Sequence, residues 1–270
     1  GRARVGFMET GSHRLCAIES CPIAAPQINA ALRGLTRMLH NPRFPRFLTS
    51  LELFTNGREV QLHAVESGRG IAAWFYDWCA ESIPGATRGA IEYDAAGYRF
   101  RVGPRSFFQV NRFLIDSLVE AALGGAEGDS ALDLYAGVGL FSLPLAARFR
   151  TVTAVESGAS ALRDLEHNAR RAGAAVAIHR GSCESVLDTL EGRPDFVLAD
   201  PPRSGLNRFV VRHLLRLRPP RLAIVSCDPA TLARDLAALV TGGFRLERLT
   251  LIDLFPQTFH LETVAHLRLE

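Results

Sequence analysis

The sequence contains no lysine, few cysteines and no long apolar run. All 31 basic residues among the 270 are therefore arginines, and the formal net charge is +3. Arginine presents a planar fork of donors that matches phosphate, so this composition permits a nucleic-acid partner without predicting one by itself. Apolar runs such as 221–225 and 196–199 are far shorter than the roughly 20 residues of a membrane helix, and the first residues lack a signal-peptide pattern. We therefore expect a cytoplasmic protein with no membrane contact.

The five cysteines are an odd number and form no Cys-x-x-Cys pair. This argues against the disulfide framework of a small secreted domain, and it leaves a thiol available for chemistry of its own. The length and the 47% content of hydrophobic residues are those of a globular protein with one catalytic domain of ordinary size and a smaller companion.

Beyond residue 130, short apolar stretches alternate with helical ones, which predicts an α/β domain with a mostly parallel sheet. The expected strands are 131–135, 151–156, 175–179, 196–200 and 222–226, and the expected helices are 140–148, 159–172, 183–190, 207–217 and 229–240. The last two apolar runs, 245–255 and 263–269, follow each other without a helix and predict an antiparallel pair. Together these strands predict a sheet of seven.

The first hundred residues have a different pattern and predict a separate α+β region. Its expected elements are a helix at 26–39 and strands at 48–55, 59–65, 70–74, 90–94 and 98–102. The turn dipeptide Gly103-Pro104 interrupts the strands, so we expect one domain at 1–103 and a second at 104–270. Because the chain opens at Gly1 without a methionine, we expect it to be part of a longer protein that has lost its N-terminal portion.

A glycine loop follows the first strand of the second domain, in the segment Asp133-Leu-Tyr-Ala-Gly-Val-Gly-Leu-Phe. Gly137 and Gly139 permit a tight turn and the close approach of a nucleotide-like cofactor to the backbone. Glu156 ends the next expected strand, where its carboxylate can accept hydrogen bonds from both hydroxyls of a ribose. The alternative interpretation is that the glycines only turn the chain and that Glu156 caps a helix.

Two further segments end the fourth and fifth expected strands, at the sheet edge where ligands of such folds collect. The first is Asp200-Pro-Pro-Arg-Ser-Gly, which is either a stiff loop beside a substrate or a structural turn. The second is Ser226-Cys-Asp-Pro, in which Asp228 and Pro229 fit a helix N-cap and first helical residue. The helix dipole should lower the pKa of the Cys227 thiol, and Asp228 opposes this; the alternative is a cysteine that only packs in the core.

Two more candidates lie outside these strand ends. Glu262 stands in the expected linker between the two terminal strands, where its carboxylate can turn back over the sheet edge or remain a solvated surface acid. The segment Phe107-Phe-Gln-Val-Asn111 offers aromatic faces and amides of the kind that stack on and hydrogen-bond a splayed-out base. The alternative for this segment is a buried aromatic pair before a polar helix start.

Taken together, these segments resemble the RNA uracil-5-methyltransferase family. The Phe-Phe-Gln-Val-Asn and Phe-Pro-Gln-Thr-Phe-His-Leu-Glu segments are most similar to its 23S ribosomal RNA branch, and the resemblance covers nearly the whole chain. It implies a Rossmann-like class I methyltransferase domain that uses S-adenosylmethionine, and a 1–103 region that binds RNA. The implied reaction is methylation of carbon 5 of a uridine, in ribosomal rather than transfer RNA, and we expect a monomer.

The resemblance also assigns roles to the matching residues. Cys227 would be the nucleophile and Glu262 the base. The implied cofactor-binding positions are Gln109, Tyr135, Gly137, Gly139, Leu140, Glu156, Ser182 and Asp200, and the implied substrate contacts are Phe107, Asn111 and Arg203. Leu140 and Ser182 depart from the family pattern, because relatives often carry Asn at the first position and Asp or Asn at the second.

The chemistry explains why a thiol and a base are needed. Carbon 5 of uracil is a weak nucleophile, so a thiolate first adds at carbon 6 and creates an enolate that can accept the methyl group. A base then removes the proton from carbon 5, and the thiolate is expelled. The uridine must leave any stack to reach such a site, which gives Phe107 and Phe108 a role.

Many relatives also carry an N-terminal oligonucleotide-binding barrel and an iron–sulfur cluster held by three closely spaced cysteines and a fourth in a Cys-Pro context. Only the fourth has a match here, Cys21-Pro22, and the nearby Cys16 does not supply the missing three. We therefore expect no cluster and no metal in this chain. Cys21 is either the remnant of a ligand set whose other members lie in a lost N-terminal portion or a simple buried thiol.

Three other functions stay open at this point. The first is methylation of carbon 5 of a uridine in transfer RNA instead of ribosomal RNA. A methyltransferase acting on carbon 5 of cytosine in RNA generally carries a second cysteine after the proline of the fourth-strand loop, where this chain has Pro202. A non-catalytic RNA-binding module could also retain the fold, and it would bind no cofactor. An amino-group methyltransferase acting on adenine is disfavoured, because Arg203 replaces the aromatic residue that such enzymes place after Pro-Pro.

Overall fold

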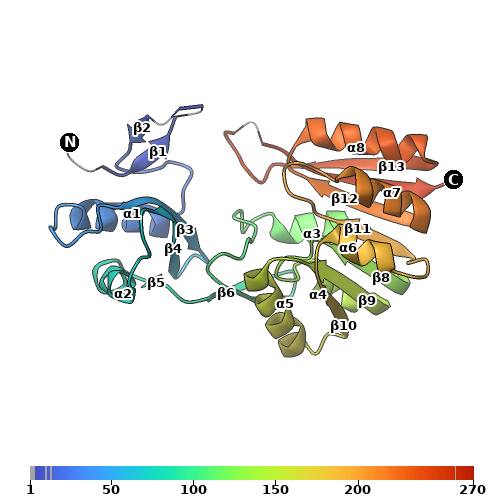
Figure 1. The fold of residues 1–270 in the computed structure, drawn as a ribbon, viewed down its shortest axis with the longest axis horizontal. Helices are drawn as coiled ribbons and strands as arrows, with labels where there is room; N and C mark the ends of the chain where they lie inside the picture. The colour runs from blue at the N-terminus through green and yellow to red at the C-terminus, as the bar shows by residue number, and fades with distance from the viewer. Residues whose placement is uncertain (1–3, 10, 13, 259) are drawn as a thin grey trace. The chain divides into compact units, whose positions relative to one another are not determined.

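The computed structural model describes residues 4–9, 11–12, 14–258 and 260–270. The chain forms two compact units (Figure 1). Unit 1 comprises Gly1–Glu92 and Gly103–Arg105, and unit 2 comprises Tyr93–Val102 and Ser106–Glu270. The division expected from the sequence lay at 103–104, so the stretch 93–102 belongs to unit 2 rather than to the first region. The reason is a pair of hydrogen bonds between residues that are distant in the sequence. The side chain of Asn168 accepts from the backbone N–H of Arg101 (2.7 Å) and donates to its carbonyl (3.1 Å).

Unit 2 contains a seven-stranded sheet in the order β10-β9-β8-β11-β12-β14-β13. Its strands are β8 (Gly128–Leu134), β9 (Phe149–Glu156), β10 (Val176–Arg180), β11 (Phe196–Ala199), β12 (Arg221–Ser226), β13 (Phe244–Ile252) and β14 (Glu262–Leu269). Strands β8 to β12 pair in parallel, whereas β14 is antiparallel to both β12 and β13. The predicted fold class, a mostly parallel sheet of seven with a terminal antiparallel pair, is confirmed.

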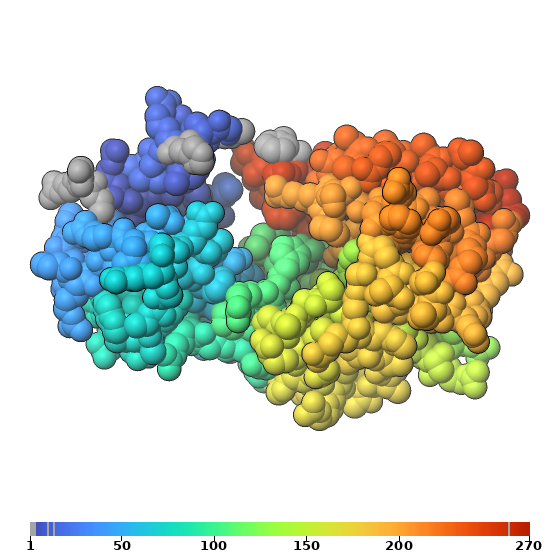
Figure 2. Space-filling view, in the orientation of Figure 1, coloured from blue at the N-terminus to red at the C-terminus, as the bar shows by residue number. Residues whose placement is uncertain are grey.

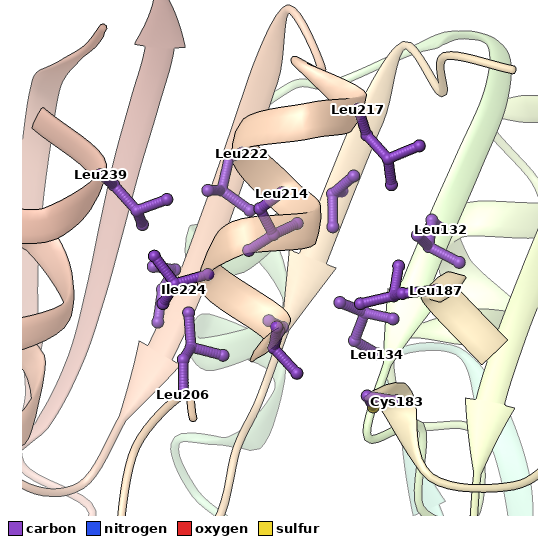
Figure 3. Packing of buried hydrophobic residues seen from close by; sticks show 14 of the residues in the cluster. Leu132, Leu134, Cys183, Leu187, Leu206, Leu214, Leu217, Leu222, Ile224 and Leu239 are labelled. Carbon is purple, nitrogen blue, oxygen red and sulfur yellow. The ribbon is translucent and has the colours of Figure 1, made fainter. Parts of the chain in front are cut away.

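Six helices accompany this sheet: α3 (Ile115–Leu123), α4 (Ser142–Ala146), α5 (Ala159–Ala172), α6 (Cys183–Thr189), α7 (Arg208–Leu217) and α8 (Pro229–Thr241). Helix α7 begins where the Asn207 side chain accepts from the N–H groups of Phe209 and Val210 (2.9 and 3.0 Å). Its Leu214 and Leu217 are three residues apart and so lie on one face of the helix. They pack against side chains of the sheet and of α6, as Figure 3 shows, in a buried cluster that also includes residues of α8. In the space-filling view, side chains occupy the room between these ribbons (Figure 2).

Unit 1 is a smaller α+β body, as predicted. It contains β1 (Gly6–Met8), β2 (Leu15–Ala17), α1 (Pro26–Met38), β3 (Leu48–Thr55), β4 (Val60–Ser67), α2 (Ala73–Ser82) and β5 (Ala86–Thr87). The hairpin β6 (Ile91–Ala95) and β7 (Tyr98–Val102) follows it. Helix α1 starts with proline at its first turn, where a missing N–H costs no hydrogen bond.

Two expected elements of the chain differ from the structure. The strand expected at 70–74 is wrong, because helix α2 begins at Ala73; its aromatic residues favour strands locally, but Phe75 and Cys79, four residues apart, are both fully buried on one helical face. The helix expected at 140–148 is shorter, five residues in α4. Of the helices in the described ranges, none combines the length and the apolar character needed to cross a membrane.

Candidate active site

The carboxyl ends of the parallel strands bring most of the predicted residues to one edge of the sheet. Tyr135 follows β8, Glu156 ends β9, Asp200 follows β11 and Cys227 follows β12. Strand β14 runs in the opposite direction, so its first residue, Glu262, lies at the same edge. Ser226 pairs with Thr263, and Cys227 and Glu262 are the residues directly next to this last pair. The expectation that Glu262 lies in a linker is corrected: it is the first residue of β14 and pairs with Ile252 of β13.

The loop after β8 is shaped by three left-handed residues, with φ of +63° at Tyr135, +56° at Gly137 and +97° at Gly139. The two glycines have different reasons to lack a side chain. A Cβ at Gly139 would come within 2.7 Å of Leu165 Cδ1, so this glycine permits close packing of α5 on the loop. A Cβ at Gly137 would meet no atom within 4 Å, so open space lies in front of this residue. Gly137 thus has room for a ligand against its backbone.

The carboxylate of Glu156 is held by backbone donors on both of its oxygens. Oε2 accepts from the N–H of Gly137 (2.8 Å), and Oε1 accepts from the N–H groups of Ser157 (2.8 Å) and Gly158 (2.5 Å). These bonds fix the orientation of the carboxylate and tie the glycine loop to the end of β9. The bond from Gly158 also agrees with the alternative interpretation, in which Glu156 caps a helix, because Gly158 is the N-cap residue of α5.

Cys227 is half-buried, and the charges of Glu262, Asp200 and Arg203 act on its thiol. Burial raises the pKa of its thiol, the charges of Glu262 and Asp200 raise it further, and the guanidinium of Arg203 opposes this effect. The sequence led us to expect a lowered thiol pKa from the dipole of α8. That expectation is wrong, because burial and the neighbouring acids outweigh the helix end. Asp228 does cap α8 as predicted: its Oδ1 accepts from the N–H of Thr231 (2.8 Å).

The two acids near Cys227 both favour their protonated forms. Glu262 is only 3% exposed, and burial raises its pKa to about 7. The pKa of Asp200 is raised well above its ordinary value by burial, then by the charges of Glu262 and Asp133. Within the described part of the chain, no hydrogen bond reaches either carboxylate. A carboxyl group with a pKa near neutrality can exchange a proton readily at physiological pH.

Asp133 is a residue of this edge that we did not assign from the sequence. It is fully buried in β8, Ser142 Oγ donates to its Oδ2 (2.5 Å), and its Oδ1 has no partner among the described residues. Burial raises its pKa to about 7; the Ser142 hydrogen bond lowers it, and the charge of Glu156 raises it. The signal was present in the sequence, because Asp133 is the one charged residue of the strand expected at 131–135.

The segment 107–111 separates into exposed and buried residues. Phe107 is 69% exposed, whereas Phe108 is buried against the rings of Tyr93 and Phe100, so the buried aromatic alternative holds for Phe108 alone. Gln109 is 4% exposed, and its Oε1 is buried without a partner in the described chain. Asn111 donates through Nδ2 to the carbonyl of Leu254 (3.2 Å), which joins this segment to the connection leading to Glu262.

The remaining predicted residues have mixed surroundings. Leu140 is buried and has no polar atom in its side chain, while Ser182 is the exposed N-cap residue of α6 and accepts from the N–H of Ser185 (3.3 Å). Arg203 is exposed in the loop after β11.

Cys21 is partly exposed, and Cys16 is exposed on β2. The side chain of Asn29 accepts from the N–H of Cys21 (2.7 Å) and donates to its carbonyl (2.9 Å), so this turn is held by hydrogen bonds within unit 1. In the ranges that the structure describes, no group of three or more His, Cys, Asp or Glu side chains is arranged to hold a metal ion.

Comparison with known proteins agrees with this geometry. A 23S rRNA (uracil(1939)-C(5))-methyltransferase, RlmD of Salmonella typhi, is 33% identical over 97% of this chain and 66% of its own length. An uncharacterized RNA methyltransferase of Streptomyces coelicolor is 46% identical over 62% of this chain and 38% of its own length. The crystal structure of Pyrococcus abyssi tRNA (uracil-54, C5)-methyltransferase in complex with S-adenosyl-L-homocysteine has a TM-score of 0.77 at 24% identity, over 98% of this chain and 72% of that one.

The chain thus spans slightly less than two thirds of the length of the Salmonella typhi relative. The sequence model of the tRNA (Uracil-5-)-methyltransferase family matches residues 90–269, which comprise nearly all of unit 2. The chain belongs to the tRNA (uracil-5-)-methyltransferase family.

Proposed function

We propose that this chain is the catalytic part of an S-adenosylmethionine-dependent enzyme that methylates carbon 5 of a uridine in 23S ribosomal RNA. The observation that carries the proposal is the position of Cys227, directly after β12, and of Glu262, the first residue of the neighbouring antiparallel strand β14, at the sheet edge that also carries the glycine loop. A nucleophile and a base close to each other and to a cofactor loop are the groups that this reaction requires.

Cys227 supplies the nucleophile. Its thiolate adds to carbon 6 of the uracil ring, and the electron pair of the carbon 5–carbon 6 double bond moves towards the carbonyl oxygen at carbon 4, which makes carbon 5 nucleophilic. The exposed guanidinium of Arg203 favours the thiolate form, because its positive charge lowers the pKa of the Cys227 thiol and so acts against burial. Arg203 therefore supports the reactive state of the thiol.

Glu262 supplies the base. Once carbon 5 carries both its proton and the new methyl group, the carboxylate of Glu262 removes the proton, the double bond re-forms, and the Cys227 thiolate leaves carbon 6. A carboxyl group at its ordinary pKa would be a poor acceptor for this proton. Burial, which raises the pKa of Glu262 to about 7, makes its carboxylate more basic and so better suited to the step.

The residues around the glycine loop fit S-adenosylmethionine. Gly137 faces open space, and Oε2 of the ordered Glu156 carboxylate, which accepts one bond, retains a lone pair that a ribose hydroxyl can use. Gln109, with its unpartnered buried Oε1, and Tyr135 are further candidates for contacts with cofactor or uracil. Leu140 contributes apolar surface only, and Ser182 offers a hydroxyl. When bound, the sulfonium of S-adenosylmethionine supplies the methyl group to carbon 5.

The choice of 23S ribosomal RNA is supported by the 33% identity to RlmD, and the choice of uracil over cytosine by Pro202, which stands where a cytosine enzyme generally has its second cysteine. Phe107, 69% exposed beside Gln109, is proposed to stack on a base of the substrate, and Asn111 holds this segment in place.

The test is covalent trapping with RNA that contains 5-fluorouridine. Fluorine at carbon 5 cannot leave as a proton does, so methyl transfer should leave the protein attached to the RNA, as a mass increase of RNA plus one methyl group. The Cys227→Ala protein should form no adduct, and the matched control Cys16→Ala, which alters an exposed cysteine of unit 1, should form it normally. If cofactor binds and the unmodified protein still gives no adduct with a 23S ribosomal RNA fragment, the proposal is wrong.

A further inference from the structure

One side of unit 1 gathers aromatic rings and arginines on two neighbouring chain segments. The N–H of Gly68 donates to the carbonyl of Phe47 (2.9 Å), and the rings of Phe44 and Phe75 meet edge to face at 5.6 Å. These contacts hold the segment 43–47 against the segment 68–75, which leads into helix α2. We use the name tryptophan surface for the following set of side chains: Arg43, Phe47, Arg69, Trp74 and Trp78.

The two tryptophans lie four residues apart on α2 and stack on each other, with ring centroids 6.3 Å apart and planes inclined by 29°. They differ in what they do for the fold. Trp78 is half-buried and packs against the hydrophobic core of unit 1. Trp74 is 41% exposed and is not part of that core cluster. The hydrophobic core therefore accounts for Trp78, whereas Trp74 contacts Trp78 and Phe75 with part of its ring and exposes the rest to solvent.

The arginines of this surface are held by ring faces instead of carboxylates. Arg43 Cζ lies 5.6 Å from the centroid of the Trp74 ring, and Arg69 Cζ lies 4.2 Å from that of Phe47. Neither takes part in an ion pair with any described residue, whereas Arg14, also in unit 1, pairs with Glu9 at 2.7 Å. A guanidinium above a ring keeps its charge and its N–H edge available, and that edge matches the oxygens of a phosphate.

We infer that the tryptophan surface binds a single-stranded segment of the RNA, with a base stacked on Trp74 and backbone phosphates on Arg43 and Arg69. Proteins that hold single strands combine stacking aromatic rings with arginines in this way, and the sequence tolerance of stacking suits contacts away from the methylated uridine. The inference rests on the proposed function in one respect, which is that RNA is the partner. An acidic protein segment would need the arginines but would have no base to stack on Trp74.

The chain offers an internal probe, because Trp74 and Trp78 are its only two tryptophans. In a Trp78→Phe protein, all tryptophan fluorescence comes from Trp74. Titration with a single-stranded 12-nucleotide RNA should quench this fluorescence saturably, and a poly-glutamate peptide of equal charge should not. Equal quenching by the peptide would overturn the inference, since it would show that charge alone is recognised.

Affinity is then measured by the anisotropy of the same RNA carrying fluorescein. Trp74→Ala should weaken binding about tenfold, and Trp74→Phe should restore most of it because a ring face remains. The double variant Arg43→Ala/Arg69→Ala should reduce the slope of log affinity against log salt by about 1.4, because each phosphate contact on a single strand contributes about 0.7. The control Arg14→Ala should change the slope little. Thermal unfolding checks that each variant is folded.

The outcomes separate this inference from the proposed function. If Trp74→Ala and the double arginine variant bind RNA as the unmodified protein does while methylation proceeds, the tryptophan surface is not an RNA site and the proposed function stands. If the unmodified protein methylates no uridine but the quenching, the Trp74 effect and the salt slope are all found, the proposed function fails and the inference stands.

Discussion

The two halves of the catalytic sheet edge treat their carboxylates differently. At the β8 and β9 half, Glu156 accepts three backbone hydrogen bonds, and its orientation is fixed. At the β11, β12 and β14 half, Asp200 and Glu262 receive no hydrogen bond from the described residues, and both have a raised pKa. The first arrangement fixes the orientation of a carboxylate, and the second raises the pKa of two buried carboxyl groups.

This difference indicates two kinds of task. A fixed, ionised carboxylate suits the binding of a ligand that donates hydrogen bonds, whereas a carboxyl group with a pKa near neutrality suits proton transfer. Cys227 lies in the second half, where its own pKa is raised by the same burial and by the same acids. The group suited to ligand binding and the groups suited to proton transfer therefore lie in different halves of one sheet edge.

The largest effect is expected from removal of the thiol. Cys227→Ala should lower the rate of methylation by more than about 10⁴-fold, because it removes the proposed nucleophile, and Cys183, which follows β10 at the same edge, is only 4% exposed. The rate is measured by transfer of labelled methyl to a 23S ribosomal RNA fragment. Cofactor affinity, measured by calorimetry, should stay unchanged, because the binding half is intact. A variant that still turns over would contradict the assignment of Cys227.

Glu262→Gln should lower the rate by about 10²- to 10⁴-fold, the range typical for loss of a general base. In contrast to Cys227→Ala, this variant should accumulate a covalent adduct with unmodified RNA, since methyl transfer precedes proton removal. Gel electrophoresis under denaturing conditions detects the adduct. The protein should remain folded, because glutamine resembles the neutral acid that burial at this position favours. Normal turnover without an adduct would place the base elsewhere.

Glu156→Ala tests the binding half. Loss of an ionised hydrogen-bond acceptor should weaken S-adenosylmethionine about 10- to 100-fold, and it should also release the loop at Gly137. Asp195→Ala is a matched control, because Asp195 likewise accepts from two backbone N–H groups, those of Asp129 and Ser130, before the start of β11. Isothermal titration should show a loss of affinity in the first variant only. Equal affinities in both variants would mean that Glu156 has no role in binding the cofactor.

The pH profile gives the smallest effect. Glu262 is an acid with a pKa raised to about 7, so its basic form is scarce at pH 6 and predominant at pH 8. The single-turnover rate should therefore rise at least about tenfold over this interval, and the raised pKa of Cys227 acts in the same direction because the thiolate also increases with pH. In the Glu262→Gln protein, the part of the pH dependence that comes from Glu262 should be absent. A rate that falls between pH 6 and pH 8 would contradict the assigned direction of proton transfer.

Local sequence patterns predicted much of unit 2. Helix α5 has the predicted bounds, 159–172, because its amphipathic pattern ends at a glycine that adopts the left-handed C-cap conformation. The prediction failed where tertiary contacts prevail over local preference. The segment Ala73-Trp-Phe-Tyr resembles a strand by composition, yet it forms a helix because this places Phe75 and Cys79 in the core of unit 1.

The sequence by itself determined which chemical groups stand at the strand ends: a glycine loop, a carboxylate, an Asp-Pro-Pro turn, and a cysteine before a helix cap. It could do so because strand period and cap residues are local properties. Only the tertiary structure decided that Glu262 begins a strand beside Cys227 and that the pKa of the thiol is raised. Burial and neighbouring charge come from segments distant in the chain, so no local pattern contains them.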